Sequence, residues 1–149
     1  MDVFADCDEI WHAGDFGSTE VSQRLSEFKL LRGVYGNIDD AAIRNLHPEH
    51  QRFEIEGLRI WMTHIGGYPG RYDQRVRDAM HDNPPDLFIC GHSHILRVQR
   101  DKRLNLLHLN PGAAGNQGAH IEKTMLRLIF DEGKLAKCHV VELGRRGMH

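Results

Sequence analysis

The sequence predicts an α/β protein, a sandwich of two sheets with helices on the outside. Short apolar stretches typical of strands alternate with helical patterns in the first half of the chain, and strands follow one another in the second half. With 149 residues, 40% of them hydrophobic and 27% charged, the chain is long enough to bury a substantial core. We therefore expect a single domain over residues 1–149.

In the first part of the chain, four predicted strands each end at a potential ligand. We expect these strands over 9–13, 31–35, 58–63 and 86–90, and they lead into Gly14-Asp15, Gly36-Asn37, His64 and Gly91-His92-Ser93-His94. Helices are expected after Ser18, over 39–46 and over 72–81. In the first helix the period of Val21, Leu25 and Phe28 predicts the face that packs on the sheet.

The remaining elements are predicted from alternation and turn residues. Residues 52–56 pair with 58–63 around Gly57, and 66–70 is expected as a mobile loop because it holds three glycines and a proline. Strands are expected over 96–100 and 104–109, followed by a carboxy-terminal hairpin over 123–130 and 134–143.

Composition argues against several classes of protein. The net charge is −2 with no basic run, so we expect no nucleic acid and no anionic membrane as a partner. The three cysteines are far apart in the sequence, which favours a reducing compartment over a disulfide framework. No apolar stretch is long enough to span a membrane, and the amino terminus does not resemble a signal peptide. We expect a cytoplasmic protein.

The ligand types at the strand ends fit a centre for two divalent cations. A carboxylate such as Asp15 can bridge two ions, an amide oxygen such as Asn37 adds a neutral ligand, and imidazoles complete each ion. His92 and His94 would present both rings to one spot if their backbone is extended, because alternate residues then point the same way. Two ions about 3.5–4 Å apart can activate a water against a phosphate ester.

The order of these motifs resembles the calcineurin-like metallophosphoesterase superfamily. The size of the chain, the Trp11-His12-Ala13-Gly14-Asp15 context and Asn110-Pro111-Gly112 look most like its YfcE-like phosphodiesterase branch. Gly14-Asp15, Gly36-Asn37-Ile38-Asp39, Thr63-His64 and Gly91-His92-Ser93-His94 are similar to the family's GD, GN-x-D, H and GH-x-H motifs. The resemblance implies a four-layer α/β/β/α sandwich of two mixed sheets with flanking helices. It also implies a phosphodiesterase that uses a metal-activated water.

The same resemblance implies a role for each ligand. Asp15 would bridge the two ions, Asn37, His64 and His92 would hold one of them, and His94 would help hold the other. Asn37 and His64 would also act on the phosphate as catalytic residues. We expect Mn²⁺, with Fe, Ni or Zn as alternatives, and a small phosphodiester as the substrate.

Two features depart from the family pattern. The family's first strand carries a D-x-H motif that completes the second metal's ligands, and this sequence has no such motif before Asp15. We therefore expect that Met1 is an internal methionine, that the second ion is weak or absent, and that a sheet edge is open. Ile38 replaces a histidine of many relatives and cannot transfer a proton, which favours diesters with good leaving groups.

Simpler interpretations remain open for each residue. Asp15 could cap the helix that begins near Ser18, and Asn37 could be a left-handed turn residue after Gly36. The chain could also be a non-catalytic protein-interaction scaffold of the same fold with an incomplete metal site. An open sheet edge would allow a homodimer, and His120 is not assigned to the site.

Overall fold

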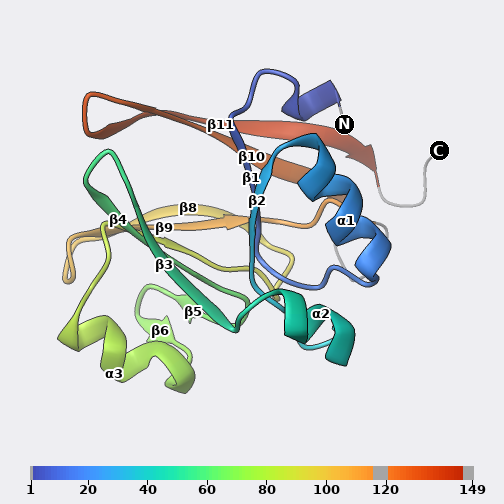
Figure 1. Ribbon diagram of the computed structural model, residues 1–149. Helices are drawn as coiled ribbons and strands as arrows, with labels where there is room; N and C mark the ends of the chain where they lie inside the picture. The colour runs from blue at the N-terminus through green and yellow to red at the C-terminus, as the bar shows by residue number, and fades with distance from the viewer. Residues whose placement is uncertain (1, 116–120, 146–149) are drawn as a thin grey trace.

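The computed structural model describes residues 2–115 and 121–145, which form a mixed α/β fold (Figure 1). Its first half contains η1 (Asp2–Phe4), β1 (Glu9–His12), α1 (Thr19–Phe28), β2 (Leu30–Gly33), α2 (Ala41–Leu46), β3 (His50–Ile55) and β4 (Leu58–Thr63). The second half contains β5 (Gly67–Tyr68), β6 (Arg71–Tyr72), α3 (Gln74–Asp82), β7 (Leu87–Ile89), β8 (Leu96–Asp101), β9 (Leu106–Pro111), β10 (Glu122–Asp131) and β11 (Lys134–Arg145).

The central layer is a five-stranded mixed sheet with the order β3-β4-β7-β9-β8. The three inner strands β4, β7 and β9 are parallel, and the edge strands β3 and β8 are antiparallel to their neighbours. β7 is buried on both faces, as its continuous apolar sequence predicts for an inner parallel strand. β4 and β7 deliver their carboxyl ends to one edge of the sheet, where His64 and His92 follow.

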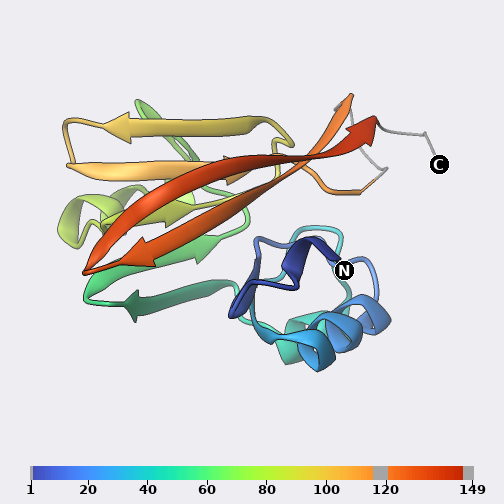
Figure 2. The ribbon, with the colours of Figure 1, turned by 90° about the horizontal axis from the view of Figure 1, so that it is seen from above.

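The second layer consists of two separate ribbons. β1 and β2 pair in parallel, and β10 and β11 form a long antiparallel hairpin that crosses over the central sheet (Figure 2). Within the part of the chain that the structure describes, β2 is the only strand hydrogen-bonded to β1. One edge of β1 is therefore open among these residues, as the sequence led us to expect.

Two cores cover the two faces of the central sheet. One lies under α3 and the short β5–β6 ribbon and is built from Trp61, Tyr72, Val76, Met80, Phe88, Cys90 and Leu106. The other lies between the sheet and the two ribbons, and its buried members are Val34, Ile60, Met62, Leu87, Ile89 and Leu109. Neighbouring residues of β4 and β7 divide between the cores because successive side chains of a strand point to opposite faces. With α1 and α2 beside β1 and β2 (Figure 1), this confirms the predicted α/β/β/α fold.

The helix boundaries follow from capping residues. Ser18, Asp40 and Asp73 are the N-caps of α1, α2 and α3, and each accepts a backbone N–H of the first turn.

The predicted packing face of α1 is wrong, because Val21 and Phe28 are each 40% exposed and Ser22 is the buried residue of the helix.

The segment 66–70, expected as a mobile loop, instead enters a short ribbon. β5 and β6 pair with Gly67 opposite Tyr72, and Gly70, with φ of 88°, lies in the turn between them.

The described residues contain no helix that is long and apolar enough to cross a membrane.

Candidate metal centre

Four of the five predicted ligands meet at the carboxyl ends of β1, β2, β4 and β7. Asn37 Oδ1 lies 2.9 Å from His64 Nε2 and 3.0 Å from His92 Nδ1. Asp15 Oδ2 lies 3.3 Å from the same His64 nitrogen. The rings of His64 and His92 are 5.2 Å apart between centroids and nearly perpendicular. Residues from four segments of the sequence therefore converge on one point.

The hydrogen bonding of His64 determines which atom faces this point. Its Nδ1 lies 2.7 Å from the carbonyl oxygen of Ala13, which can only accept, so Nδ1 carries the proton. Burial lowers the pKa of His64, which favours the neutral ring, and Nε2 then presents a lone pair. Nε2 thus faces the oxygens of Asn37 and Asp15 without a proton between them. Three electron-pair donors arranged in this way fit a bound cation.

In the structure Asp15 is not a helix cap and Asn37 is not a left-handed turn residue. The cap of α1 is Ser18, whereas Asp15 Oδ1 accepts the backbone N–H of Ile38 at 3.2 Å. Asn37 is not among the described residues with positive φ, so it is not a left-handed turn residue.

The two histidines of the Gly91-His92-Ser93-His94 segment are held differently from our expectation. β7 ends at Ile89, and the φ angles of His92 and His94 are 67° and 62°. Extended alternation is therefore the wrong account of this pair, because both residues have left-handed backbone. Such backbone is uncommon for residues other than glycine and is found preferentially at functional sites. Asp15 shares the feature, with φ of 63°.

Asp39 joins the loop of Asp15 to the loop of Asn37, a role that the sequence reasoning missed. Its carboxylate accepts backbone N–H groups from Gly36 at 2.8 Å, Gly17 at 2.9 Å and Phe16 at 3.1 Å. Burial alone would raise the pKa of Asp39, but these N–H groups outweigh it and hold the pKa below its usual value. The GN-x-D motif contained the signal, since its aspartate needs a partner once it is buried.

Two glycines allow the loops to come this close. A Cβ atom placed on Gly36 would lie 2.0 Å from Asp15 Oδ1, and one on Gly14 would lie 2.5 Å from His64 Nδ1. Gly14 also has φ of 104°, a conformation that L side chains rarely adopt. The glycines that precede Asp15 and Asn37 are therefore required by the packing of the cluster.

Asn110 is a second positioning residue that the sequence reasoning missed. Its side chain is buried, and its Nδ2 donates to the carbonyl of Gly91 and to Ser93 Oγ, each at 3.1 Å. Its Oδ1 accepts the N–H of Gly112 at 3.0 Å, which fixes the amide orientation. Asn110 therefore holds the segment that carries His92. The sequence predicted a turn at Asn110-Pro111-Gly112 and a resemblance to the YfcE-like branch there, but no role for Asn110 at the site.

His12, which is not one of the predicted ligands, packs beside the loop that carries Asp15. Its Nδ1 accepts the N–H of Gly14 at 3.1 Å, and its ring stacks on Phe16 at 3.8 Å. Phe16 in turn stacks on His47 at 4.4 Å. Burial lowers the pKa of His12 to about 4, so the ring is neutral at pH 7 and can accept this hydrogen bond.

The convergent cluster differs in composition from a site built of imidazole, thiolate and carboxylate ligands alone. His94 lies two residues beyond His92 in the same segment and is half-buried. Among the residues described, no three His, Cys, Asp or Glu side chains are grouped as ready metal ligands, and the convergent cluster depends on the amide of Asn37. His120 lies outside the described residues.

With this geometry established, known proteins provide a comparison. Residues 1–133 match the model of the calcineurin-like phosphoesterase superfamily domain. The chain belongs to this superfamily. A probable metallophosphoesterase of Methanothermobacter thermautotrophicus is 33% identical over 116 residues, which are 76% of this chain and 64% of that protein. This chain thus spans less than two thirds of that relative.

Solved structures of low sequence identity share the metallophosphoesterase fold. An archaeal phosphodiesterase matches with a TM-score of 0.73 and 21% identity, covering 95% of this chain and 88% of that one. A single-mutant Vps29 from Entamoeba histolytica matches with a TM-score of 0.72 and 18% identity, covering 96% and 87%. A predicted phosphoesterase from Streptococcus pneumoniae has a TM-score of 0.66 and 21% identity, covering 95% and 86%.

Proposed function

We propose that this protein is a metal-dependent phosphodiesterase that hydrolyses a small phosphodiester with an activated water. Family membership supports phosphoesterase chemistry in general. The observation that carries the proposal is the convergence of His64 Nε2, Asn37 Oδ1 and Asp15 Oδ2, three electron-pair donors with no proton among them. A divalent ion, when bound, supplies Lewis acidity to a phosphate oxygen and lowers the pKa of a water.

The chain's own residues orient the ligand atoms and fix which nitrogen of His64 carries the proton. Ala13 keeps the proton of His64 on Nδ1, so Nε2 stays directed at the centre as an electron-pair donor. Asn37 lies between His64 and His92 and is placed to contact the phosphate or the ion. Ile38 is 55% exposed and cannot donate a proton, so the leaving group departs without an acid at this position. This limitation favours diesters whose leaving groups are already weak bases.

A dinuclear centre remains part of the proposal. Asp15 has a second carboxylate oxygen with which to bridge, and His94 follows His92 closely enough in sequence to serve a second ion. We propose Mn²⁺ because the donors mix carboxylate, amide and imidazole, and Fe, Ni or Zn would suit the same atoms. The second ion is expected to bind more weakly than the first, because the sequence has no D-x-H motif before Asp15 to complete its ligands.

The proposal is tested by hydrolysis of bis(4-nitrophenyl) phosphate with added Mn²⁺. We expect turnover that chelation abolishes and that falls at least 100-fold in Asn37→Ala and His92→Ala, since each change removes a ligand atom. His81→Ala, on the last turn of α3, is the matched histidine control and should retain turnover. A folded wild-type protein that gives no metal-dependent hydrolysis would contradict the proposal.

A second candidate, a protein-interaction scaffold, is favoured by apolar side chains next to the cluster. Ile38 and Ile95, which adjoin Asn37 and His94, are 55% and 58% exposed. Exposed apolar groups beside a site are typical of contact surfaces. Under the scaffold alternative the ligand variants would leave partner binding intact, and Ile38→Ser with Ile95→Ser would abolish it.

The remaining expectations are proposals of the same kind. We propose a cytoplasmic protein because its three cysteines are far apart in the sequence. We propose that it binds neither nucleic acid nor membrane because the net charge is only −2 with no basic run. The open edge of β1 would serve a homodimer by strand pairing.

A further inference from the structure

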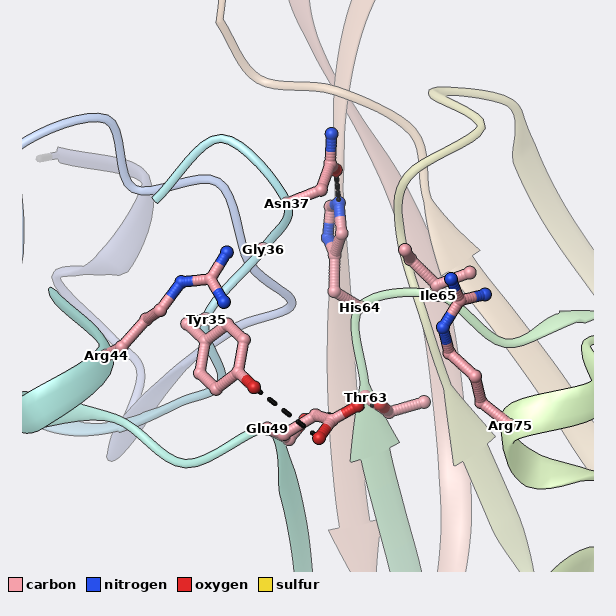
Figure 3. A pocket seen from close by; sticks show the side chains of 9 residues that line it. All are labelled: Tyr35, Gly36, Asn37, Arg44, Glu49, Thr63, His64, Ile65 and Arg75. Atoms are coloured by element: carbon pink, nitrogen blue, oxygen red, sulfur yellow. Dashed lines mark hydrogen bonds between the residues drawn. The ribbon is translucent and has the colours of Figure 1, made fainter. Parts of the chain in front are cut away.

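A small pocket adjoins the cluster on the side of Asn37 and His64. Its volume is about 180 Å³, and its walls come from the segment after β2, from α2, from the end of β4 and from α3 (Figure 3). Ligand pockets for drug-sized molecules have volumes of about 300–1,000 Å³, so this one suits a short arm of a substrate. Arg44 and Arg75 stand on opposite sides of it in Figure 3.

Arg44 is held in place before any ligand arrives. Its Nε donates to the carbonyl of Asp39 at 2.9 Å, and its guanidinium lies over the Tyr35 ring, 4.5 Å from the centroid. Figure 3 shows the group extending from α2 toward the side where Asn37 lies. Within residues 2–115 and 121–145, neither of its terminal nitrogens donates to a protein acceptor. A guanidinium fixed by its Nε and by stacking loses little entropy when it binds an anion.

Arg75 approaches from the other wall and is partly neutralised. Its Nη1 lies 2.9 and 3.0 Å from the two carboxylate oxygens of Asp73, and its side chain is half exposed. The other charged group of the wall is Glu49, which accepts the Tyr35 hydroxyl at 3.4 Å and lies 3.8 Å from His50 Nε2. Because Asp73 offsets the charge of Arg75, Arg44 is the guanidinium of this pocket best placed to bind one small anionic group.

We propose that Arg44, assisted by Arg75, binds a carboxylate on a short arm of the phosphodiester substrate. The inference rests on the proposed function, because it assigns the substrate class for the same site. The two terminal nitrogens of Arg44 match the two oxygens of a planar carboxylate. The substrate is thus a diester in which one ester arm ends in a carboxylate. The adjoining cluster holds the phosphate while Arg44 holds the arm.

The first test measures binding, which does not depend on turnover. In the presence of Mn²⁺, calorimetry compares 4-phosphonobutyrate with butylphosphonate, in which a methyl group replaces the carboxylate. We expect the wild type to bind the carboxylate ligand about tenfold more tightly. Arg44→Gln should remove this preference, Arg75→Gln should reduce it less, and Arg24→Gln on the exposed side of α1 should keep it. Arg44→Lys retains the positive charge but lacks the two terminal nitrogens that match a carboxylate. This variant should show an intermediate preference for the carboxylate ligand.

The second test uses two chromogenic esters with the same leaving group. We expect kcat/KM for 4-nitrophenyl 3-carboxypropyl phosphate to exceed that for 4-nitrophenyl butyl phosphate by about tenfold, and Arg44→Gln to remove the difference. Hydrolysis of both esters at equal kcat/KM, with equal binding of the phosphonates, would overturn the inference and leave the proposed function standing. Absence of any metal-dependent hydrolysis would refute the proposed function, and the phosphonate comparison would still decide whether Arg44 selects a carboxylate.

Discussion

The substitution Asp39→Asn tests how the two ligand loops are held together. Asp39 Oδ2 accepts the N–H groups of Gly36 and Phe16, and Oδ1 accepts that of Gly17. An asparagine keeps the shape but turns one oxygen into an NH₂ group, so at least one backbone N–H faces another donor. Losing a hydrogen bond to a buried charged group costs about 1.5–3 kcal/mol. We expect the free energy of unfolding to fall by about that amount.

The assay is urea unfolding followed by far-ultraviolet circular dichroism. With a slope near 2 kcal/mol/M, the expected loss lowers the midpoint by about 1 M. Asp40→Asn is the matched control, because it removes the same charge from the next residue while asparagine remains a good N-cap for α2. A loss below about 0.5 kcal/mol in Asp39→Asn, or a loss equal to that of Asp40→Asn, would refute the reasoning.

Because the pKa of Asp39 is lowered in the folded state, the free energy of unfolding should fall as the pH becomes acidic. The folded protein holds this proton less tightly than the unfolded chain, so the stabilisation is fully present above the ordinary value of 3.8. It is lost as the pH falls through the lower value of the folded state. In acid titrations the difference in free energy of unfolding between the wild type and Asp39→Asn should therefore disappear below about pH 4. An advantage that stays constant down to pH 2 would contradict this assignment.

Three further predictions concern packing, two at the site and one in the core under α3. Gly36→Ala should abolish metal-dependent hydrolysis, because its Cβ would lie 2.0 Å from Asp15 Oδ1; a fully active variant would show that the loops need not approach so closely. Asn110→Ala should loosen the segment that carries His92 and weaken Mn²⁺ binding about 10-fold by calorimetry, and unchanged affinity would argue against its positioning role. Met80→Ala should cost about 2–5 kcal/mol in urea unfolding, because the side chain is fully buried, and leave kcat of the folded protein unchanged.

The sequence predicted best where a pattern reports directly on burial. β4 and β7 are apolar because both of their faces are covered, and α3 places Val76 and Met80 in the core as their spacing indicates. Ser18 marks the start of the first helix because its side chain accepts a free N–H group of the first turn. These are local effects, and a single sequence contains them.

Prediction failed where a distant contact decides the local structure. The spacing of His92 and His94 suggested an extended chain, but the segment is held by Asn110, from β9, in a left-handed conformation. The motif indicated that a buried Asp39 needs partners, but it could not identify them, because two of the three N–H donors belong to a loop more than twenty residues away. In α1 the exposed Val21 shows that an apolar period does not fix which face is covered when the neighbouring layer is narrow.

The most direct test of the metal centre is a Mn²⁺ titration of the purified protein, with free Mn²⁺ measured by electron paramagnetic resonance. We predict that the wild type binds at least one equivalent, and that Asn37→Ala and His64→Ala each weaken this binding at least tenfold. A second, weaker equivalent that Asp15→Ala also removes would support a dinuclear centre. Wild-type affinity no greater than that of the two single variants would contradict the account, because the convergent donors would then hold no ion.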